Sequence, residues 1–200
     1  MRIVGLAWSR TRYSGGTWDP GGLSELGVSL LKAMRRKHVI LDLSHMAQQA
    51  VEEALAIWTG PVLASHSNAR ELVPGERQLA AATVAEVARR GGVVGISFAG
   101  SHLRPPHAAA RPTLADVVDH VIHHARSAGS AEHVGLGTDL DGGFPAARSP
   151  VDRMEELAEL RRLLRARFTK RDTDGIMGDN WIAFLRRSLP ARRPGTETTN

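Results

Sequence analysis

Apolar residues recur along the chain with two alternating periods, and each period predicts one kind of element. Short runs rich in Val, Ile and Leu are typical of buried strands, and we expect strands at residues 3–8, 39–43, 61–64, 93–98 and 133–137. In the intervening stretches apolar residues return every three or four positions. This spacing predicts helices at residues 23–37, 47–58, 83–90, 114–128, 154–168 and 173–188.

The alternation of strand and helix predicts an α/β protein with a mainly parallel sheet and right-handed crossovers. The spacing of the strand ends fits the βα units of a TIM-like (β/α)8 barrel, which needs eight strands. Only five strands are visible in the pattern. We therefore expect a partial barrel with outer helices, forming a single domain over residues 1–190. The polar residues 191–200 are expected to be a disordered tail.

Three of the predicted strands end in residues that bind metals or carry protons. The strand at 39–43 leads to His45, the strand at 61–64 leads to His66, and the last strand leads to Asp139. Ligands and catalytic groups collect at the carboxyl ends of parallel strands. If the first two of these strands are neighbours, about 4.8 Å apart, both imidazoles can meet one cation. The alternative is that each histidine is an ordinary hydrogen-bonded residue at a strand end.

Polar residues around the two histidines are candidates to orient them, namely Asp42, Ser44, Ser65 and Ser67. Asp139 is a candidate proton carrier beside a metal-bound water.

Other histidines carry weaker signals. His120 and His124 are four residues apart on one predicted helix, as in some zinc sites, but no HExxH motif accompanies them. We expect that helix in the outer ring, far from the strand ends, and favour a structural role for both residues. His102 and His107 lie in the long loop predicted at 100–112, where they could border a substrate pocket.

Composition narrows the chemistry. Cysteine is absent, so disulfides and thiolate metal sites are excluded, and any metal must be held by His, Asp or Glu. The net charge of +5 comes from arginines scattered along the chain without interleaved aromatics, so we expect no nucleic-acid partner. Since neither a leader nor a run of about 18 apolar residues is visible, we expect no membrane partner and a cytoplasmic location.

At these residues the chain resembles the membrane (renal) dipeptidase family of zinc metallopeptidases. The resemblance covers nearly the whole chain. Its most specific part is the ordered set DLSH, SHSNAR and GTDLDG, at residues 42–45, 65–70 and 137–142. The resemblance implies a (β/α)8 barrel, a two-zinc centre and hydrolysis of dipeptides.

Carried over residue by residue, the resemblance implies that His45 and His66 are the two histidine ligands of the second zinc. Arg77 matches the arginine that binds the substrate carboxylate, and Asp139 matches the aspartate near the scissile bond. Trp8 stands where the family has a substrate-binding histidine. We therefore expect a substrate preference that differs from that of the family.

The chain departs from the family in its metal ligands. The HxD pair and the bridging glutamate of the family lie before the matched region, and no substitute is visible. We expect absent or very low activity for these 200 residues alone, and association with another copy or with a missing half. Two rival functions stay open: another metal-dependent amidohydrolase or lactonase-type hydrolase, and a non-catalytic fragment or interaction module.

Overall fold

The computed structural model of the chain describes residues 1–105, 108 and 110–190. Its strands are β1 (Ile3–Gly5), β2 (Ile40–Asp42), β3 (Val62–Leu63), β4 (Val94–Ile96) and β5 (Val134–Leu136). Its α-helices are α1 (Glu25–Arg36), α2 (Gln48–Ile57), α3 (Ala81–Arg89), α4 (Gly100–Leu103), α5 (Leu114–Ala128), α6 (Leu157–Arg165), α7 (Lys170–Asp174) and α8 (Asn180–Ser188). Three short 3₁₀ turns cover residues 131–133, 146–148 and 154–156, and a π-helical turn covers 175–179. The predicted tail at 191–200 and His107 lie outside the described residues.

The described strands pair only in parallel and follow one another in chain order. β1 pairs with β2, β2 with β3, and β4 with β5. A single parallel bridge between Ala64 and Val94 links the two groups. The prediction of an α/β protein with five parallel strands is therefore confirmed. Because consecutive strands are neighbours, the residues that follow β2 and β3 lie side by side.

Some predicted boundaries are wrong. The first strand ends at Gly5 rather than at residue 8, because the carbonyl of Leu6 accepts a hydrogen bond from the Thr11 hydroxyl instead of a neighbouring strand. The predicted loop at 100–112 begins with the short helix α4. The predicted helix at 173–188 is divided among α7, the π-helical turn and α8, because Gly178 leaves the helical conformation.

Local capping explains the boundaries of the best-predicted helices. The Ser24 side chain accepts a hydrogen bond from the Gly27 amide at the start of α1. Thr113 and Asp116 form a reciprocal capping box at the start of α5. α5 ends at Gly129, whose φ of 73° is the left-handed conformation that glycine adopts at low cost.

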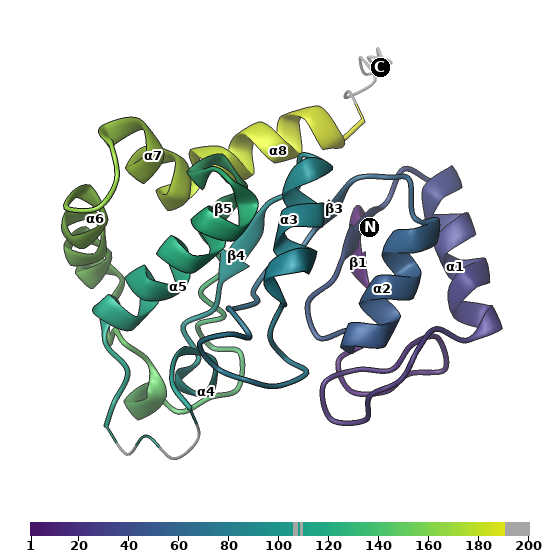
Figure 1. Ribbon diagram of the computed structural model, residues 1–200, viewed down its shortest axis with the longest axis horizontal. Coiled ribbons are helices and arrows are strands. Elements are labelled where there is room, and N and C mark those ends of the chain that lie inside the picture. The colour runs from purple at the N-terminus through teal and green to yellow at the C-terminus, as the bar shows by residue number, and fades with distance from the viewer. Residues whose placement is uncertain (106–107, 109, 191–200) are drawn as a thin grey trace, which may run out of the picture.

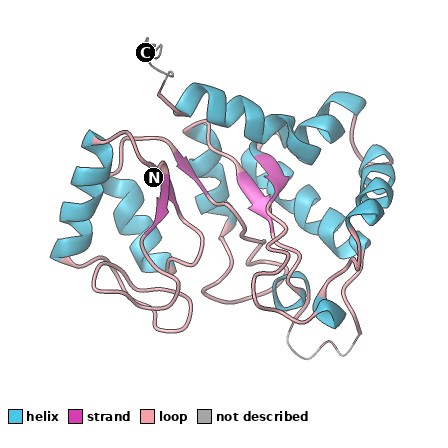
Figure 2. Cartoon of the chain, turned by 180° about the vertical axis from the view of Figure 1, so that it is seen from behind, coloured by secondary structure: helices cyan, strands magenta, loops and turns pink. Residues whose placement is uncertain are grey.

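The helices lie mainly on one face of the strands. Figure 1 shows α1, α2, α3 and α5 on that face, and Figure 2 shows the strands from the opposite side. α8 crosses near the amino ends of the strands, where Phe184 packs against Ile40, Leu63 and Val93. The loops that follow the strands gather at the other end of the sheet (Figure 1). Within the described part of the chain, no helix is long and apolar enough to cross a bilayer.

Candidate metal centre

His45 and His66 lie in direct contact beyond the carboxyl ends of β2 and β3. Their Nε2 atoms are 3.0 Å apart, and their ring centroids are 5.0 Å apart at an angle of 62°. The predicted convergence of the two imidazoles is therefore present in the structure. Whether the pair binds a metal stays a prediction at this point.

The opposite nitrogen of each ring faces a hydroxyl group. His66 Nδ1 is 2.7 Å from Ser65 Oγ, and His45 Nδ1 is 3.3 Å from Thr17 Oγ1. The Thr17 hydroxyl also donates to the His45 carbonyl, which leaves its oxygen lone pairs free to accept from the ring. If both Nδ1 atoms carry the proton, both Nε2 lone pairs point to the same place. Hydroxyl partners of this kind fix the tautomer of metal-binding histidines.

The backbone around the pair is fixed by Asp42 and Ser44. Asp42 Oδ1 accepts hydrogen bonds from the amides of Ser44 and Ser65, at 3.0 and 2.9 Å. The His66 amide donates to Ser44 Oγ at 3.0 Å. Of the four predicted orienting residues, Ser44 and Ser65 contact His66 directly, and Asp42 holds the residues that precede the two histidines.

Two local features of the backbone are unusual for this site. His45 has a φ of 70°, a left-handed conformation that costs free energy for a residue with a side chain. The carbonyl oxygen of Ser65 lies 1.8 Å from the place that a Cβ of residue 137 would occupy. Only glycine at position 137 allows the chain before His66 to approach β5 so closely.

Burial keeps both imidazoles neutral. Burial, together with the charges of Arg77 and His66, lowers the pKa of His45 to about 3. Burial and the Arg77 charge also lower the pKa of His66, whereas the carboxylates of Asp139 and Asp42 oppose this effect. Neutral imidazole is the form that binds metals, so both residues are ready to act as ligands near neutral pH.

Arg77 lies beneath His66. Its side chain is buried, with 8% of the residue exposed, and it donates to Ser67 Oγ at 3.0 Å and to the His66 carbonyl at 2.6 Å. Its Nε has no hydrogen-bond partner among the described residues. Burial lowers the pKa of Arg77 to about 10, so the guanidinium stays charged at neutral pH. Asp139 is close enough for its charge to oppose that shift.

Asp139 and Trp8 complete the predicted set. Asp139 has a φ of 58°, and its Oδ1 lies 2.1 Å from the place that a Cβ of Gly142 would occupy. Trp8 is 65% exposed, and its ring centroid is 5.9 Å from that of His45. The structure therefore brings the five predicted site residues to one end of the sheet.

Sequence reasoning gave no role to Thr17 or Asn68 and only a general one to His102. Thr17 lies in a loop with no recognisable motif, so no signal in the sequence indicates its contact with His45. His102 lies on α4, and its Nδ1 is hydrogen-bonded to Ser97 Oγ at 2.9 Å. Burial is the main cause that lowers the pKa of His102 to about 3, and the charges of Arg77, His66 and His45 act in the same direction. His102 also accepts a hydrogen bond at its carbonyl from Asn68 Nδ2, at 3.0 Å.

The donor set fits one part of a zinc centre. Two nitrogens bound to one tetrahedral zinc, each about 2.0–2.1 Å from it, lie about 3.3 Å apart. The observed separation of 3.0 Å needs only a small movement to reach that value. Among the described residues, however, no cluster of three or more His, Cys, Asp or Glu side chains surrounds a common point. The pair can therefore supply two ligands of a centre whose other ligands come from elsewhere.

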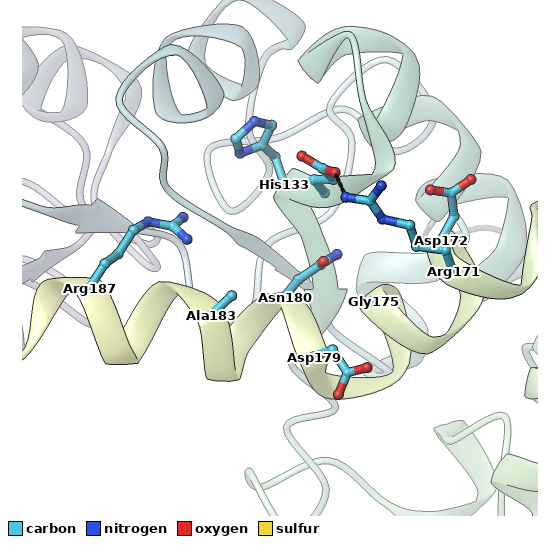
Figure 3. Close-up of a pocket in the computed structure, with 9 residues that line it drawn as sticks. His133, Arg171, Asp172, Gly175, Asp179, Asn180, Ala183 and Arg187 are labelled. Atoms are coloured by element: carbon cyan, nitrogen blue, oxygen red, sulfur yellow. Dashed lines mark hydrogen bonds and ion pairs between the residues drawn. The ribbon is translucent and has the colours of Figure 1, made fainter.

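A separate cavity lies at the opposite end of the sheet. It has a volume of about 380 Å³ and contains Glu132 and His133, which precede β5, and residues of α8. Figure 3 shows Arg187, Ala183 and Asn180 along α8. Arg171 forms an ion pair with Glu132 at 2.8 Å. None of the five predicted site residues lines this cavity, so it is distinct from the histidine pair.

The fold and the pair define the chain as an α/β protein with a candidate metal site at the carboxyl end of a parallel sheet. Residues 1–193 match the family described as membrane dipeptidase, peptidase family M19. The chain belongs to this family.

Relatives agree with this assignment. The chain is 32% identical over 185 residues to an uncharacterized dipeptidase of Schizosaccharomyces pombe, covering 92% of this chain and 44% of the relative. It is 33% identical over 171 residues to dipeptidase tcpJ of Claviceps purpurea, covering 82% of this chain and 38% of the relative. The chain thus spans less than half the length of these curated relatives.

Solved structures show the same fold. A metallo peptidase from Rhodobacter sphaeroides, liganded with a phosphinate mimic of the dipeptide L-Ala-D-Ala, matches with a TM-score of 0.82 and 28% identity. The match covers 94% of this chain and 56% of that one. The M19 metallo peptidase named dipeptidase AC matches with a TM-score of 0.82 and 30% identity, covering 94% of this chain and 58% of that one.

Proposed function

We propose that this chain supplies one part of the catalytic centre of a zinc-dependent dipeptidase. The observation that carries the proposal is the contact between His45 Nε2 and His66 Nε2, with a hydroxyl partner behind each ring. Membership in a metallopeptidase family supports a bound metal, and a nitrogen pair with carboxylates nearby is typical of zinc. When bound, zinc supplies a nucleophilic water near neutral pH and polarises the scissile carbonyl.

The other site residues then act on the substrate. Arg77 would pair with the carboxylate of a dipeptide, since a guanidinium meets a carboxylate at two points. Two of its five N–H donors are used within the protein, which leaves three, among them that of Nε, for the carboxylate. Asp139 would hold and transfer a proton at the scissile bond. Trp8, exposed beside His45, would border the substrate and alter its preference relative to the family.

The partial TIM-like barrel belongs to the same proposal. Five parallel strands in chain order, with helices on one face, match slightly more than half of two larger M19 structures. We infer that a further segment or a second copy of the chain contributes the remaining ligands. The 200 residues alone are then expected to bind zinc weakly and to hydrolyse dipeptides slowly or not at all, because two histidines are an incomplete donor set.

Zinc titration of the purified 200-residue chain tests the proposal. We expect Zn²⁺ to shift the imidazole ¹⁵N signals of His45 and His66, and to leave His123, on the outer helix, unchanged. His45→Ala and His66→Ala should each abolish the shift, whereas His123→Ala should keep it. Ser65→Ala, which removes the partner of His66 Nδ1, should weaken zinc binding by about 10-fold to 100-fold.

Two results would contradict the proposal. One is the absence of any zinc-dependent shift at His45 and His66. The other is hydrolysis of a lactone or cyclic amide, but not of dipeptides, by a complete protein that includes this chain, which would favour a different amidohydrolase. Efficient dipeptide hydrolysis by the 200 residues alone would overturn the expected low activity.

A further inference from the structure

Two buried histidines of α5 contact the backbone that directly follows His66. His124 Nε2 lies 3.0 Å from the Ser67 carbonyl oxygen, and His120 Nδ1 accepts a hydrogen bond from the Ala69 amide at 3.1 Å. The expectation that this helix lies far from the strand ends is therefore wrong for these two side chains. Both reach the loop that begins at the carboxyl end of β3.

The contacts fix the tautomers of both rings. A carbonyl oxygen only accepts, so His124 Nε2 carries the proton and donates it to Ser67. An amide N–H only donates, so His120 Nδ1 is unprotonated, and its Nε2 donates to the Leu103 carbonyl at 3.3 Å. Burial lowers the pKa of each ring to about 4, which keeps both neutral and preserves this pattern at neutral pH.

Packing alone does not explain these residues. His120 and His124 are 1% and 0% exposed, and His124 Nδ1 is buried without a hydrogen-bond partner among the described residues. Burying an unpaired polar nitrogen costs free energy that an apolar side chain of similar size avoids. The imidazole of His124 therefore contributes through its donor, and the group that receives it is the peptide next to His66.

The same short segment is held from other directions. Arg77 donates to the His66 carbonyl and to the Ser67 hydroxyl, and the Ser67 amide donates to the Gly95 carbonyl. Together with the α5 histidines, these contacts hold the backbone on the carboxyl side of His66 at successive peptide groups. The direction of the His66 ring toward His45 depends on that backbone.

We propose that His120 and His124 are positioning residues for His66: α5 fixes the peptide groups of Ser67 and Ala69, and these fix the direction in which His66 presents Nε2. The consequence for zinc rests on the function proposed above. The claim that α5 makes the backbone of residues 67–69 rigid depends only on the hydrogen bonds described above.

The test uses three variants of the 200-residue chain with Zn²⁺ alone as the probe. His124→Leu removes the donor to Ser67, and His124→Gln keeps a donor close to the position of Nε2. His123→Leu is the matched control on the same helix, because the His123 ring faces Glu71 instead, at 3.7 Å. Zinc affinity is measured from the His45 and His66 ¹⁵N shifts at a temperature where circular dichroism shows every variant folded.

We expect His124→Leu to weaken zinc binding by about 10-fold, the lower end of the range for residues that orient metal ligands. His124→Gln should recover most of the affinity, and His123→Leu should stay within about twofold of the unsubstituted chain. Should His124→Leu fail to fold, His124→Asn replaces it, since its shorter amide cannot reach the Ser67 carbonyl. The same loss is expected.

A second measurement separates this proposal from the proposed function. Without metal, amide hydrogen exchange at Ser67 and Ala69 should become at least 10-fold faster in His124→Leu, relative to amides in α2. If the unsubstituted chain takes up no zinc, the proposed function fails while the exchange data still decide the positioning role. Unchanged exchange at both amides, unchanged zinc affinity, or a His124→Gln variant as weak as His124→Leu would overturn the positioning role.

Discussion

Replacement of the buried residue Asn68 should destabilise the end of the sheet that carries the candidate site. Asn68 follows β3, is 0% exposed and connects the loop after His66 to the end of β4. Its Oδ1 accepts from the Ser97 amide at 2.7 Å, and its Nδ2 donates to the carbonyls of Ser97 and His102, at 3.1 and 3.0 Å. Asn68→Ala would leave the buried N–H and C=O of Ser97 and the part-buried C=O of His102 without these partners.

The cost can be worked from these contacts. A buried polar group that loses its partner costs about 1–3 kcal/mol, and the small cavity adds to this. For three groups, with partial relaxation, we expect a loss of about 3–5 kcal/mol in the free energy of unfolding. Whole domains are stable by only about 5–15 kcal/mol, so this loss is a large fraction of the total. Asn68→Asp keeps the volume and the acceptor but removes both donors, and should cost about 2–4 kcal/mol.

Urea unfolding of the 200-residue chain, followed by circular dichroism, measures the effect. With a slope of about 2 kcal/mol per molar urea, the midpoint should fall by about 1.5–2.5 M for Asn68→Ala. Gln49→Ala is the control, because the Gln49 side chain is exposed on α2 and, among the described residues, bonds Glu53 alone. This change should alter stability by at most about 0.5 kcal/mol. An Asn68→Ala loss below about 1 kcal/mol would refute the reasoning, since it would mean that the three backbone groups find other partners.

Two further predictions use groups at the same end of the sheet. The free energy of unfolding should fall as the pH drops from about 6.5 to about 4. His120 and His124 should each account for about 3 kcal/mol, because both imidazoles take up a proton in the unfolded chain in this pH range but stay neutral when buried in the folded chain. Urea midpoints measured across this pH range check the prediction. The double variant His120→Gln/His124→Gln should lose less stability per pH unit than the unsubstituted chain, and an equal loss in both would contradict the prediction. Gly142→Ala should displace the Asp139 carboxylate, because the new Cβ would lie 2.1 Å from Oδ1. Gly143→Ala, with no atom within 4 Å but a φ of +94°, should cost about 1 kcal/mol in stability and leave the Asp139 carboxyl ¹³C signal in place, whereas Gly142→Ala should shift that signal.

The sequence was sufficient for the order of elements and for the approximate place of the site. Runs of Val, Ile and Leu correctly indicated the five described strands, and three of these runs were followed by a candidate residue, His45, His66 or Asp139, that lies beyond the carboxyl end of its strand. His45 and His66 could be paired in advance because parallel strands joined by one helix are usually neighbours. The ends of the elements were less predictable, as with β1 and the interrupted helix before α8, because side-chain hydrogen bonds and a single glycine decide them.

The residues that hold the histidine pair and the neighbouring backbone in place could not be inferred in the same way. Thr17 reaches His45 from a loop that is distant in sequence, and His120 and His124 reach the backbone after His66 from α5. Asn68 is close to His66 in sequence, but its side chain bonds the distant residues Ser97 and His102. Periodicity describes which face of a helix is buried, but it does not indicate which backbone group that face meets. The sequence favoured a structural role for His120 and His124, and only their hydrogen bonds show that they hold the loop after His66.

The sequence by itself determined the α/β class, the parallel order of the strands and the chemical types available for a metal: histidine and carboxylate without cysteine. These follow from local patterns of polarity and from composition, which depend on nearby residues alone. Tertiary structure alone decided that the two Nε2 atoms meet at 3.0 Å, that Arg77 is buried beneath them, and that α5 holds the backbone beside His66. Such distances arise from the packing of residues up to 57 positions apart, and that packing is fixed only when the core closes.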